Sequence, residues 1–294
     1  MAHKNFSGTG VAIVTPFRND GSIDFKSLGK LLEHIIRNGV NYIVPLGTTG
    51  ESVTLSKDEK KAVVNFVTDT VNCRVPVVVG IGGNNTQEIL DSVTSFDFAN
   101  VDGLLSVSPY YNKPSQRGIF AHFKVIAEVS PVPVIIYNVP GRTGSNITAE
   151  TTLKLAKEVK NIVAVKEASG NLAQIMQIIR DKPKNFQVIS GDDMLTLPMM
   201  AMGASGAISV IANACPKPFS DMVNQALQGH FDRASVIHYK LFELMIALFE
   251  EGSPSGIKSA LEAIKITPNN VRLPLVPVSD ALKKRIEGLM LAIK

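Results

Sequence analysis

The chain alternates short apolar segments with longer segments of mixed polarity. The apolar segments are rich in valine and isoleucine and occupy residues 11–16 (VAIVTP), 41–47 (NYIVPLG), 75–80 (VPVVVG), 102–108 (DGLLSVS), 132–138 (VPVIIYN), 161–167 (NIVAVKE), 186–190 (FQVIS) and 206–210 (GAISV). Continuous apolarity, rather than strict alternation, is typical of strands buried on both faces of a parallel sheet covered by helices. The pattern therefore predicts eight buried parallel strands.

Helical patterns lie between these predicted strands. Residues 56–70 are one example, because Ser56 and Glu59 form a capping box ahead of the apolar positions of a helix. Eight βα units within about 225 residues match the size of a (β/α)8 barrel. A doubly wound open sheet is the main alternative. We favour the α/β class with a (β/α)8 TIM barrel.

The strand pattern stops after Gln228. The remaining chain predicts helices over roughly 231–251, 254–267 and 279–292, with proline and glycine at the breaks. We therefore expect a catalytic barrel over residues 1–228 and a small C-terminal helical domain over residues 229–294.

Composition narrows the classes of function. The chain has 30 basic and 26 acidic residues, and the basic ones are scattered, which argues against a nucleic-acid or membrane-binding patch. Cys73 and Cys215 belong to no CxxC or metal-spaced group, which argues against a disulfide framework and a zinc site. No apolar leader or long apolar stretch is present, so we expect a cytoplasmic protein.

Known cofactor and metal motifs are also absent. The histidines form no HExxH or HxH group, residues 80–83 (GIGG) miss the GxGxxG pattern, and neither a P-loop nor a GxSxG elbow occurs. The sequence therefore predicts neither a bound metal nor NAD or ATP, and it offers a serine hydrolase no support.

Lys166 closes the apolar segment at 161–167. Alternation places it on the same face as Ile162 and Ala164, and if that face points inward, Lys166 enters the barrel mouth. Apolar neighbours disfavour the charged form of an amine, and the neutral amine can attack a ketone to form a Schiff base. The structural alternative is a strand-ending lysine that reaches into water. A tyrosine on the preceding predicted strand, Tyr137, favours the nucleophile.

Other polar side chains follow the predicted strands. Thr48 and Thr49 lie in a glycine-rich turn before a capped helix, which can cradle an anion, although an ordinary βα turn has the same composition. Tyr110 and Tyr111 lie between prolines and could relay a proton or pack at a rim. Arg142 suits a carboxylate, although many loop arginines are merely solvated.

Four motifs together resemble a known family. GTTGES (47–52), SPYYNKP (108–114), YNVPGRT (137–143) and VAVKEASG (163–170) are similar in order and spacing to dihydrodipicolinate synthases, and the resemblance spans nearly the whole chain. It implies condensation of pyruvate with L-aspartate 4-semialdehyde, in lysine and diaminopimelate biosynthesis. It also implies that the only covalent group is a pyruvate Schiff base, without metal or organic cofactor.

The resemblance also implies roles for individual residues. Lys166 would form the Schiff base, Tyr137 would be the general acid and base, and Thr48 would connect Tyr137 to Tyr111 of a neighbouring subunit. The substrate-binding residues would be Thr49, Arg142, Gly191 and Ile208. Because Tyr111 would cross an interface, we expect a homo-oligomer, a tetramer built from dimers.

The same resemblance bears on regulation by lysine. The allosteric lysine pocket of the family corresponds here to Ser52, Asn84, Glu88 and Tyr110. Two positions that commonly hold histidine in lysine-inhibited relatives are Lys57 and Lys60 in this chain. A cationic Lys60 would repel the ammonium group of a lysine ligand or compete with it for Glu88. We therefore expect weak or absent inhibition by lysine.

Three other functions remain to be weighed. Another pyruvate aldolase, such as N-acetylneuraminate lyase or a 2-keto-3-deoxy sugar acid aldolase, would share Lys166, but the lyase lacks a counterpart of Arg142 and usually has serine at the first threonine of GTTGES. A catalytically inactive barrel that binds a metabolite is a second possibility. A phosphosugar enzyme is a third, although its phosphate site usually follows strands seven and eight.

Overall fold

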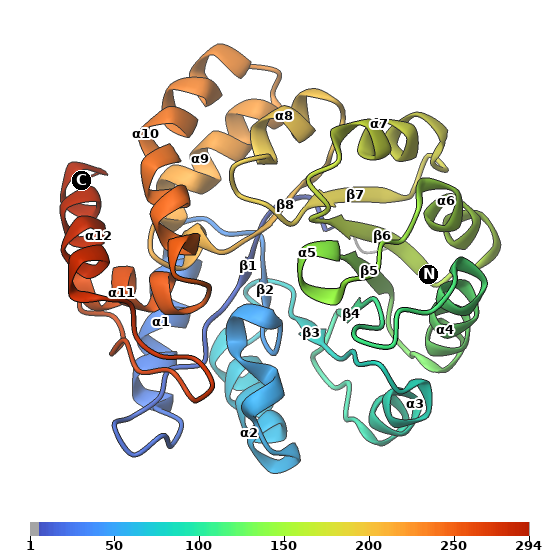
Figure 1. Cartoon of the computed structure of the whole chain (residues 1–294), viewed down its shortest axis with the longest axis horizontal. Helices are drawn as coiled ribbons and strands as arrows, with labels where there is room; N and C mark the ends of the chain where they lie inside the picture. The colour runs from blue at the N-terminus through green and yellow to red at the C-terminus, as the bar shows by residue number, and fades with distance from the viewer. Residues whose placement is uncertain (1–5, 294) are drawn as a thin grey trace.

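Eight parallel strands form the centre of the molecule (Figure 1). The computed structural model describes residues 6–293. The strands are β1 (Gly8–Ala12), β2 (Tyr42–Val44), β3 (Val78–Gly80), β4 (Gly103–Val107), β5 (Val134–Asn138), β6 (Ile162–Glu167), β7 (Gln187–Ser190) and β8 (Gly206–Ser209). They are ordered β2-β1-β8-β7-β6-β5-β4-β3, and each of the eight predicted apolar segments supplies one of them.

Contacts between β2 and β3 close the sheet into a barrel. Ile43 and Val77 form a parallel bridge. The Ile43 amide donates to the Pro76 carbonyl at 3.0 Å, and the Gly80 amide donates to the Pro45 carbonyl at 3.0 Å. An open doubly wound sheet would leave its two edge strands apart. The predicted (β/α)8 barrel is therefore confirmed, and the open alternative is wrong.

Helices surround the barrel and continue beyond it (Figure 1). They are α1 (Phe25–Arg37), α2 (Lys57–Val71), α3 (Thr86–Ser95), α4 (Gln116–Val129), α5 (Pro140–Thr143), α6 (Ala149–Glu158), α7 (Leu172–Asp181), α8 (Thr196–Ala201), α9 (Pro216–Leu227), α10 (Phe231–Glu250), α11 (Ser255–Ala263) and α12 (Asp280–Ile293). Short 3-10 helices are η1 (Thr48–Gly50), η2 (Ser52–Thr54) and η3 (Ile211–Asn213). The predicted capping box of Ser56 and Glu59 is confirmed at α2.

The first strand starts earlier than its apolar pattern predicts. Residues 11–16 are the apolar segment, whereas β1 is Gly8–Ala12. A side chain at Gly10 would overlap the ring of Tyr42, which lies across this strand with its hydroxyl 3.3 Å from the Ala207 carbonyl. Gly10 therefore belongs to the strand because the Tyr42 ring fills the space that a side chain would take.

Two apolar clusters hold the barrel. The smaller one fills the interior and comprises Phe6, Ala12, Tyr42, Val44, Val78, Leu105, Ile135, Tyr137, Val139, Val163, Ala164, Ile189 and Ile208. The larger cluster lies between the strands and the helices. Strands with apolar side chains on both faces are what this double burial requires.

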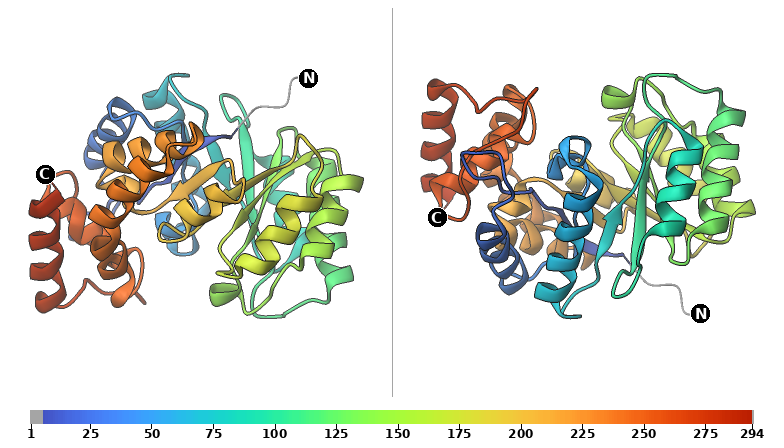
Figure 2. Two further views of the ribbon diagram at one scale, coloured as in Figure 1. Left: turned by 90° about the horizontal axis from the view of Figure 1, so that it is seen from above. Right: turned by 90° about the horizontal axis from the view of Figure 1, so that it is seen from below.

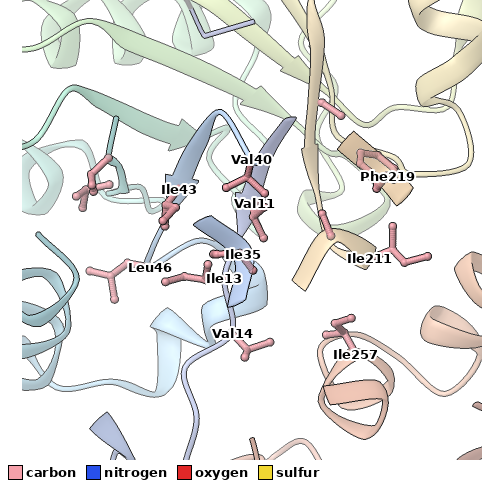
Figure 3. Close-up of a cluster of buried hydrophobic side chains, with 14 of the residues drawn as sticks. Val11, Ile13, Val14, Ile35, Val40, Ile43, Leu46, Ile211, Phe219 and Ile257 are labelled. Carbon is pink, nitrogen blue, oxygen red and sulfur yellow. The ribbon is translucent and has the colours of Figure 1, made fainter. Parts of the chain in front are cut away.

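The C-terminal helices α10, α11 and α12 stand to one side of the barrel (Figure 2). Ile257 of α11 faces Ile211 of η3 and Val14 near β1 (Figure 3). The helices thus share an apolar cluster with the barrel wall. The proposed division between residues 228 and 229 falls between α9 and α10. Over residues 6–293, no helix combines the length and hydropathy needed to cross a membrane.

Candidate active site

Lys166 and Tyr137 lie side by side near the carboxyl ends of adjacent strands. The register of β5 and β6 pairs their Cα atoms, and the Lys166 Nζ atom lies 4.2 Å from the centroid of the Tyr137 ring. Both side chains are buried, Lys166 with 5 % and Tyr137 with 6 % of its surface exposed. The amine predicted from the sequence to enter the barrel mouth is therefore held against a phenol.

The surroundings of Lys166 favour its neutral form. Burial lowers the pKa of Lys166 to about 8, the negative charge of Asp193 opposes this, and the positive charge of Arg142 adds to it. An amine with this pKa has a larger neutral fraction near neutral pH than an ordinary lysine. The site can therefore present a nucleophilic amine.

The phenol of Tyr137 stays protonated at neutral pH. Burial raises the pKa of Tyr137 to about 12, while Arg142 and a hydrogen bond with the Thr48 side chain oppose the rise. A neutral phenol can give a proton to a leaving hydroxyl and later recover it. The structure thus brings together three of the predicted site residues, Lys166, Tyr137 and Thr48.

The turn after β2 is held in an unusual backbone conformation. Leu46 and Glu51 have φ angles of 58° and 51°, in the left-handed region. A side chain at Gly80 would overlap the Leu46 carbonyl, so only glycine permits the close approach of the two loops. Between these points, Thr49 in η1 is buried and Thr48 is exposed. The conformation of the turn that carries Thr48 and Thr49 is therefore fixed by its backbone, and anion binding there stays a prediction.

A buried ion pair supports this turn from outside the barrel. The Lys258 ammonium of α11 lies 2.5 Å from a Glu51 carboxylate oxygen, and both side chains are at most 1 % exposed. Lys258 also donates to the Asn270 carbonyl at 2.7 Å, and the Arg272 amide donates to Glu51 at 3.0 Å. The C-terminal region thus anchors the residue that follows η1. Sequence reasoning did not identify this contact, because its partners lie far apart in the chain.

A second buried network of hydrogen bonds joins the carboxyl ends of β5 and β6, the strands that carry Tyr137 and Lys166. The Asn138 amide donates to the Glu167 carboxylate at 2.7 Å, and these residues directly follow Tyr137 and Lys166. Glu167 also accepts from Ser169 Oγ at 2.6 Å. Because the pair is fully buried, it resists slippage between β5 and β6.

Gly191 lies against Lys166, and Ile208 belongs to the interior of the barrel. A Cβ atom at Gly191 would come within 2.9 Å of the Lys166 Cε atom and of the Ala168 Cβ atom, so the lysine stem packs directly on the glycine backbone. Ile208 of β8 is buried in the same interior cluster as Ala164 and Ile189. Both predicted positions therefore face the interior that holds the amine.

Arg142 and Tyr111 lie at the mouth of the barrel. Arg142 in α5 is exposed, yet its charge lowers the pKa of both Lys166 and Tyr137. Tyr111 has a φ angle of 69°, its side chain is 88 % exposed, and its amide donates to the Thr143 carbonyl at 3.3 Å. Within one chain, Tyr111 thus projects outward and does not join the Tyr137 cluster.

The residues of the predicted lysine pocket occupy neighbouring loops. Asn112 Nδ2 donates to the Asn84 carbonyl at 2.9 Å, which ties the loop after β3 to the loop that carries Tyr110. Ser52 begins η2, and Glu88 is exposed in the first turn of α3. Binding of lysine there stays a prediction. Over the described part of the chain, no group of three or more His, Cys, Asp or Glu side chains could hold a metal.

One buried acid was not singled out from the sequence. Asp193 is 4 % exposed, and its charge acts on Lys166. Its position in the Gly-Asp-Asp segment directly after the seventh apolar stretch was the available signal, because polar residues after barrel strands collect at the active site.

Comparisons with known proteins identify the family of this chain. The sequence model of the Dihydrodipicolinate synthetase family matches residues 5–293. A 4-hydroxy-tetrahydrodipicolinate synthase of Flavobacterium psychrophilum is 52 % identical over 282 residues, covering 96 % of each chain. One from Bacillus subtilis is 43 % identical over 276 residues, covering 94 % of this chain and 95 % of its own.

Solved structures are similar throughout. The crystal structure of dihydrodipicolinate synthase from Aquifex aeolicus superimposes with a TM-score of 0.94 at 41 % identity, covering 97 % of each chain. A chloride-inhibited dihydrodipicolinate synthase from Acinetobacter baumannii, complexed with pyruvate, has a TM-score of 0.95 at 38 % identity, covering 98 % of this chain and 99 % of its own. The chain belongs to the dihydrodipicolinate synthetase family.

Proposed function

We propose that this protein is a 4-hydroxy-tetrahydrodipicolinate synthase, which condenses pyruvate with L-aspartate 4-semialdehyde. The product is a cyclic precursor of diaminopimelate and lysine. The observation that carries the proposal is the buried amine of Lys166, whose pKa is lowered to about 8, against the phenol of Tyr137. Membership of the family supports the choice of substrates.

The first half of the reaction builds an imine on Lys166. The neutral amine attacks the ketone carbon of pyruvate, and the resulting carbinolamine loses water as Tyr137 gives a proton to the departing hydroxyl. Thr49 and the backbone at Ile208 hold the pyruvate carboxylate and carbonyl region. No metal or organic cofactor takes part, since the protonated imine itself withdraws electrons.

The second half forms the carbon–carbon bond. The imine loses a proton from the pyruvate methyl group to the Tyr137 oxygen, which gave up its own proton in the first half. The enamine carbon then attacks the aldehyde of the semialdehyde, and Tyr137 returns the proton to the aldehyde oxygen, which becomes a hydroxyl. The semialdehyde's amine then attacks the imine carbon, which closes the ring and releases Lys166. Arg142 guides the semialdehyde's carboxylate, because a guanidinium binds that group through two hydrogen bonds. Gly191 leaves the space beside the lysine stem.

The proton route extends across a subunit interface in this proposal. Thr48 connects Tyr137 to Tyr111 of a neighbouring subunit, and the outward direction of Tyr111 supports this.

The assembly is a homotetramer built from dimers, and full activity of a monomer would contradict it. A related structure is that of a monomeric dihydrodipicolinate synthase variant, so the molecular mass of this protein in solution tests the tetramer. Disulfides are rare in cytosolic proteins, and Cys73 and Cys215 are both free, which supports a cytoplasmic location.

A paired substrate assay tests the function. The purified protein is incubated with pyruvate and L-aspartate 4-semialdehyde, and separately with pyruvate and N-acetylmannosamine. We expect turnover only of the first pair. Turnover of the second pair alone would identify a sialic acid aldolase instead, and no turnover of any aldehyde acceptor would favour an inactive binding protein.

Replacing Tyr137 with phenylalanine tests the proton donor. The change removes only the hydroxyl, so we expect kcat to fall by about 10²- to 10⁴-fold while the fold is kept. Steady-state kinetics of the condensation measure the effect. Tyr239→Phe on the exposed face of α10 is the matched control and should retain full activity. If kcat of Tyr137→Phe fell by less than about tenfold, the phenol would not be the proton donor of the chemical step.

A further inference from the structure

The Asp193 carboxylate joins the loop after β7 to the end of β8. Its Oδ2 atom accepts hydrogen bonds from the amides of Val210 at 3.0 Å and Ile211 at 2.8 Å. The Ser209 hydroxyl forms a third hydrogen bond with the same carboxylate. Asp193 therefore receives donors from three consecutive residues at the carboxyl end of β8.

These hydrogen bonds, called the Asp193 clamp below, add to a short ladder between β7 and β8. β7 and β8 have a single register pair, Ser190 with Ala207, whereas β6 and β7 have four. Ile208, which belongs to the same interior cluster as Tyr137, lies between that pair and the amides that Asp193 holds. On its other side Ile208 pairs with Gly10 of β1, so the carboxylate holds β8 on the β7 side, just beyond Ile208.

The same carboxylate supplies negative charge to the amine. Three groups that can carry charge act at Lys166: Arg142 of α5 disfavours the ammonium, Asp193 favours it, and the Tyr137 ring of β5 lies against it. Burial raises the pKa of Asp193 to about 6, and the hydrogen bonds from Ser209, Val210 and Ile211 oppose the rise, so the group is mostly ionised above that pH.

The adjacent aspartate has a different environment. Asp192 Oδ1 accepts from the amides of Met194 at 3.0 Å and Leu195 at 3.3 Å, in the turn before α8. Its charge acts on Tyr137 and Asp193, whereas Asp193 acts on Lys166. Two neighbouring acids of equal charge therefore form a matched pair for experiment.

We propose that Asp193 is a positioning residue of the pyruvate site, whose buried carboxylate fixes the carboxyl end of β8 beside Ile208 and balances the charge of Lys166. This inference rests on the proposed function, because it assigns Asp193 a part in the reaction of Lys166 with pyruvate.

The charge is tested by the pH dependence of imine formation. The wild type, Asp193→Asn and Asp192→Asn are incubated with pyruvate over a pH series, reduced with borohydride, and the labelled fraction at Lys166 is measured by mass spectrometry. Asparagine keeps an oxygen for the two amides but lacks the charge, so its ammonium form of Lys166 is less stable. We expect the midpoint of labelling to move to lower pH in Asp193→Asn and to stay in place in Asp192→Asn.

The clamp is tested by Asp193→Ala, which loses the acceptor as well as the charge. We expect KM for pyruvate to rise about tenfold above that of Asp193→Asn, and the midpoint to move in the same direction. This second variant also keeps the test open if Asp193→Asn does not fold.

The outcomes separate this inference from the function beneath it. Labelling of wild-type Lys166 with unchanged midpoints in both Asp193 variants would overturn the role of the charge and leave the proposed function standing. Equal KM values in the two variants would overturn the clamp. Absence of any label on wild-type Lys166 would overturn the proposed function and this inference together.

Discussion

Replacing Lys166 with arginine is expected to lower kcat by at least about 10³-fold. A guanidinium remains protonated at every accessible pH, so it offers no lone pair to the pyruvate ketone. Arginine has nearly the length of lysine and keeps the positive charge beside Tyr137 and Asp193. The loss would therefore report the missing covalent step rather than a missing charge. Steady-state assay of the condensation is the measurement.

A second lysine provides the control for this substitution. Lys182 is also partly buried, and its ammonium donates to the Phe186 carbonyl at 2.7 Å, before β7. Lys182→Arg can keep that hydrogen bond and should retain wild-type kcat. If Lys166→Arg kept more than about a hundredth of the activity, a covalent role for Lys166 would be refuted.

The largest expected effect on stability is at the buried ion pair of Glu51 and Lys258, next to the turn that carries Thr48 and Thr49. Lys258→Met leaves the Glu51 carboxylate buried without its cation, and removal of one partner from a buried pair typically costs about 3–5 kcal/mol. Urea unfolding measures the free energy of unfolding. Because Glu51 directly follows η1, which holds Thr49, KM for pyruvate should also rise.

Two variants complete the test of this pair. Lys217→Met removes an exposed partner from the pair with Asp221 on α9 and should cost less than about 1 kcal/mol. The double variant Glu51→Gln with Lys258→Met removes the unpaired charge and should be more stable than Lys258→Met alone. Equal stability of the single and double variants would show that the buried charge is not the source of the cost.

The barrel, Lys166 and Tyr137 could be predicted from the sequence for a physical reason. Strands buried on both faces must be apolar throughout, so a lysine or tyrosine that ends such a strand is conspicuous. Lys166 and Tyr137 were predicted in this way, and the register of β5 and β6 places them side by side. The capping box of α2 was legible because it is local.

Contacts between residues that lie far apart in the sequence could not be predicted. Glu51 and Lys258 lie 207 positions apart, and nothing in either neighbourhood indicates the other. The donors to Asp193 belong to the same class, since Val210 and Ile211 directly follow β8 and lie 17 and 18 positions away. The start of β1 was misplaced because the space beside Gly8 is taken by Asn41 and the space beside Gly10 by the ring of Tyr42. In each case a tertiary contact, rather than a local preference, decides the structure.

The central claim is that pyruvate forms an imine with Lys166, and borohydride reduction tests it most directly. The protein is incubated with pyruvate, reduced and digested, and the modified peptide is identified by mass spectrometry, with a sample reduced without pyruvate as the control. We predict the mass of a reduced pyruvate adduct on Lys166. An adduct on a different lysine, or none after full exposure to pyruvate, would contradict the account.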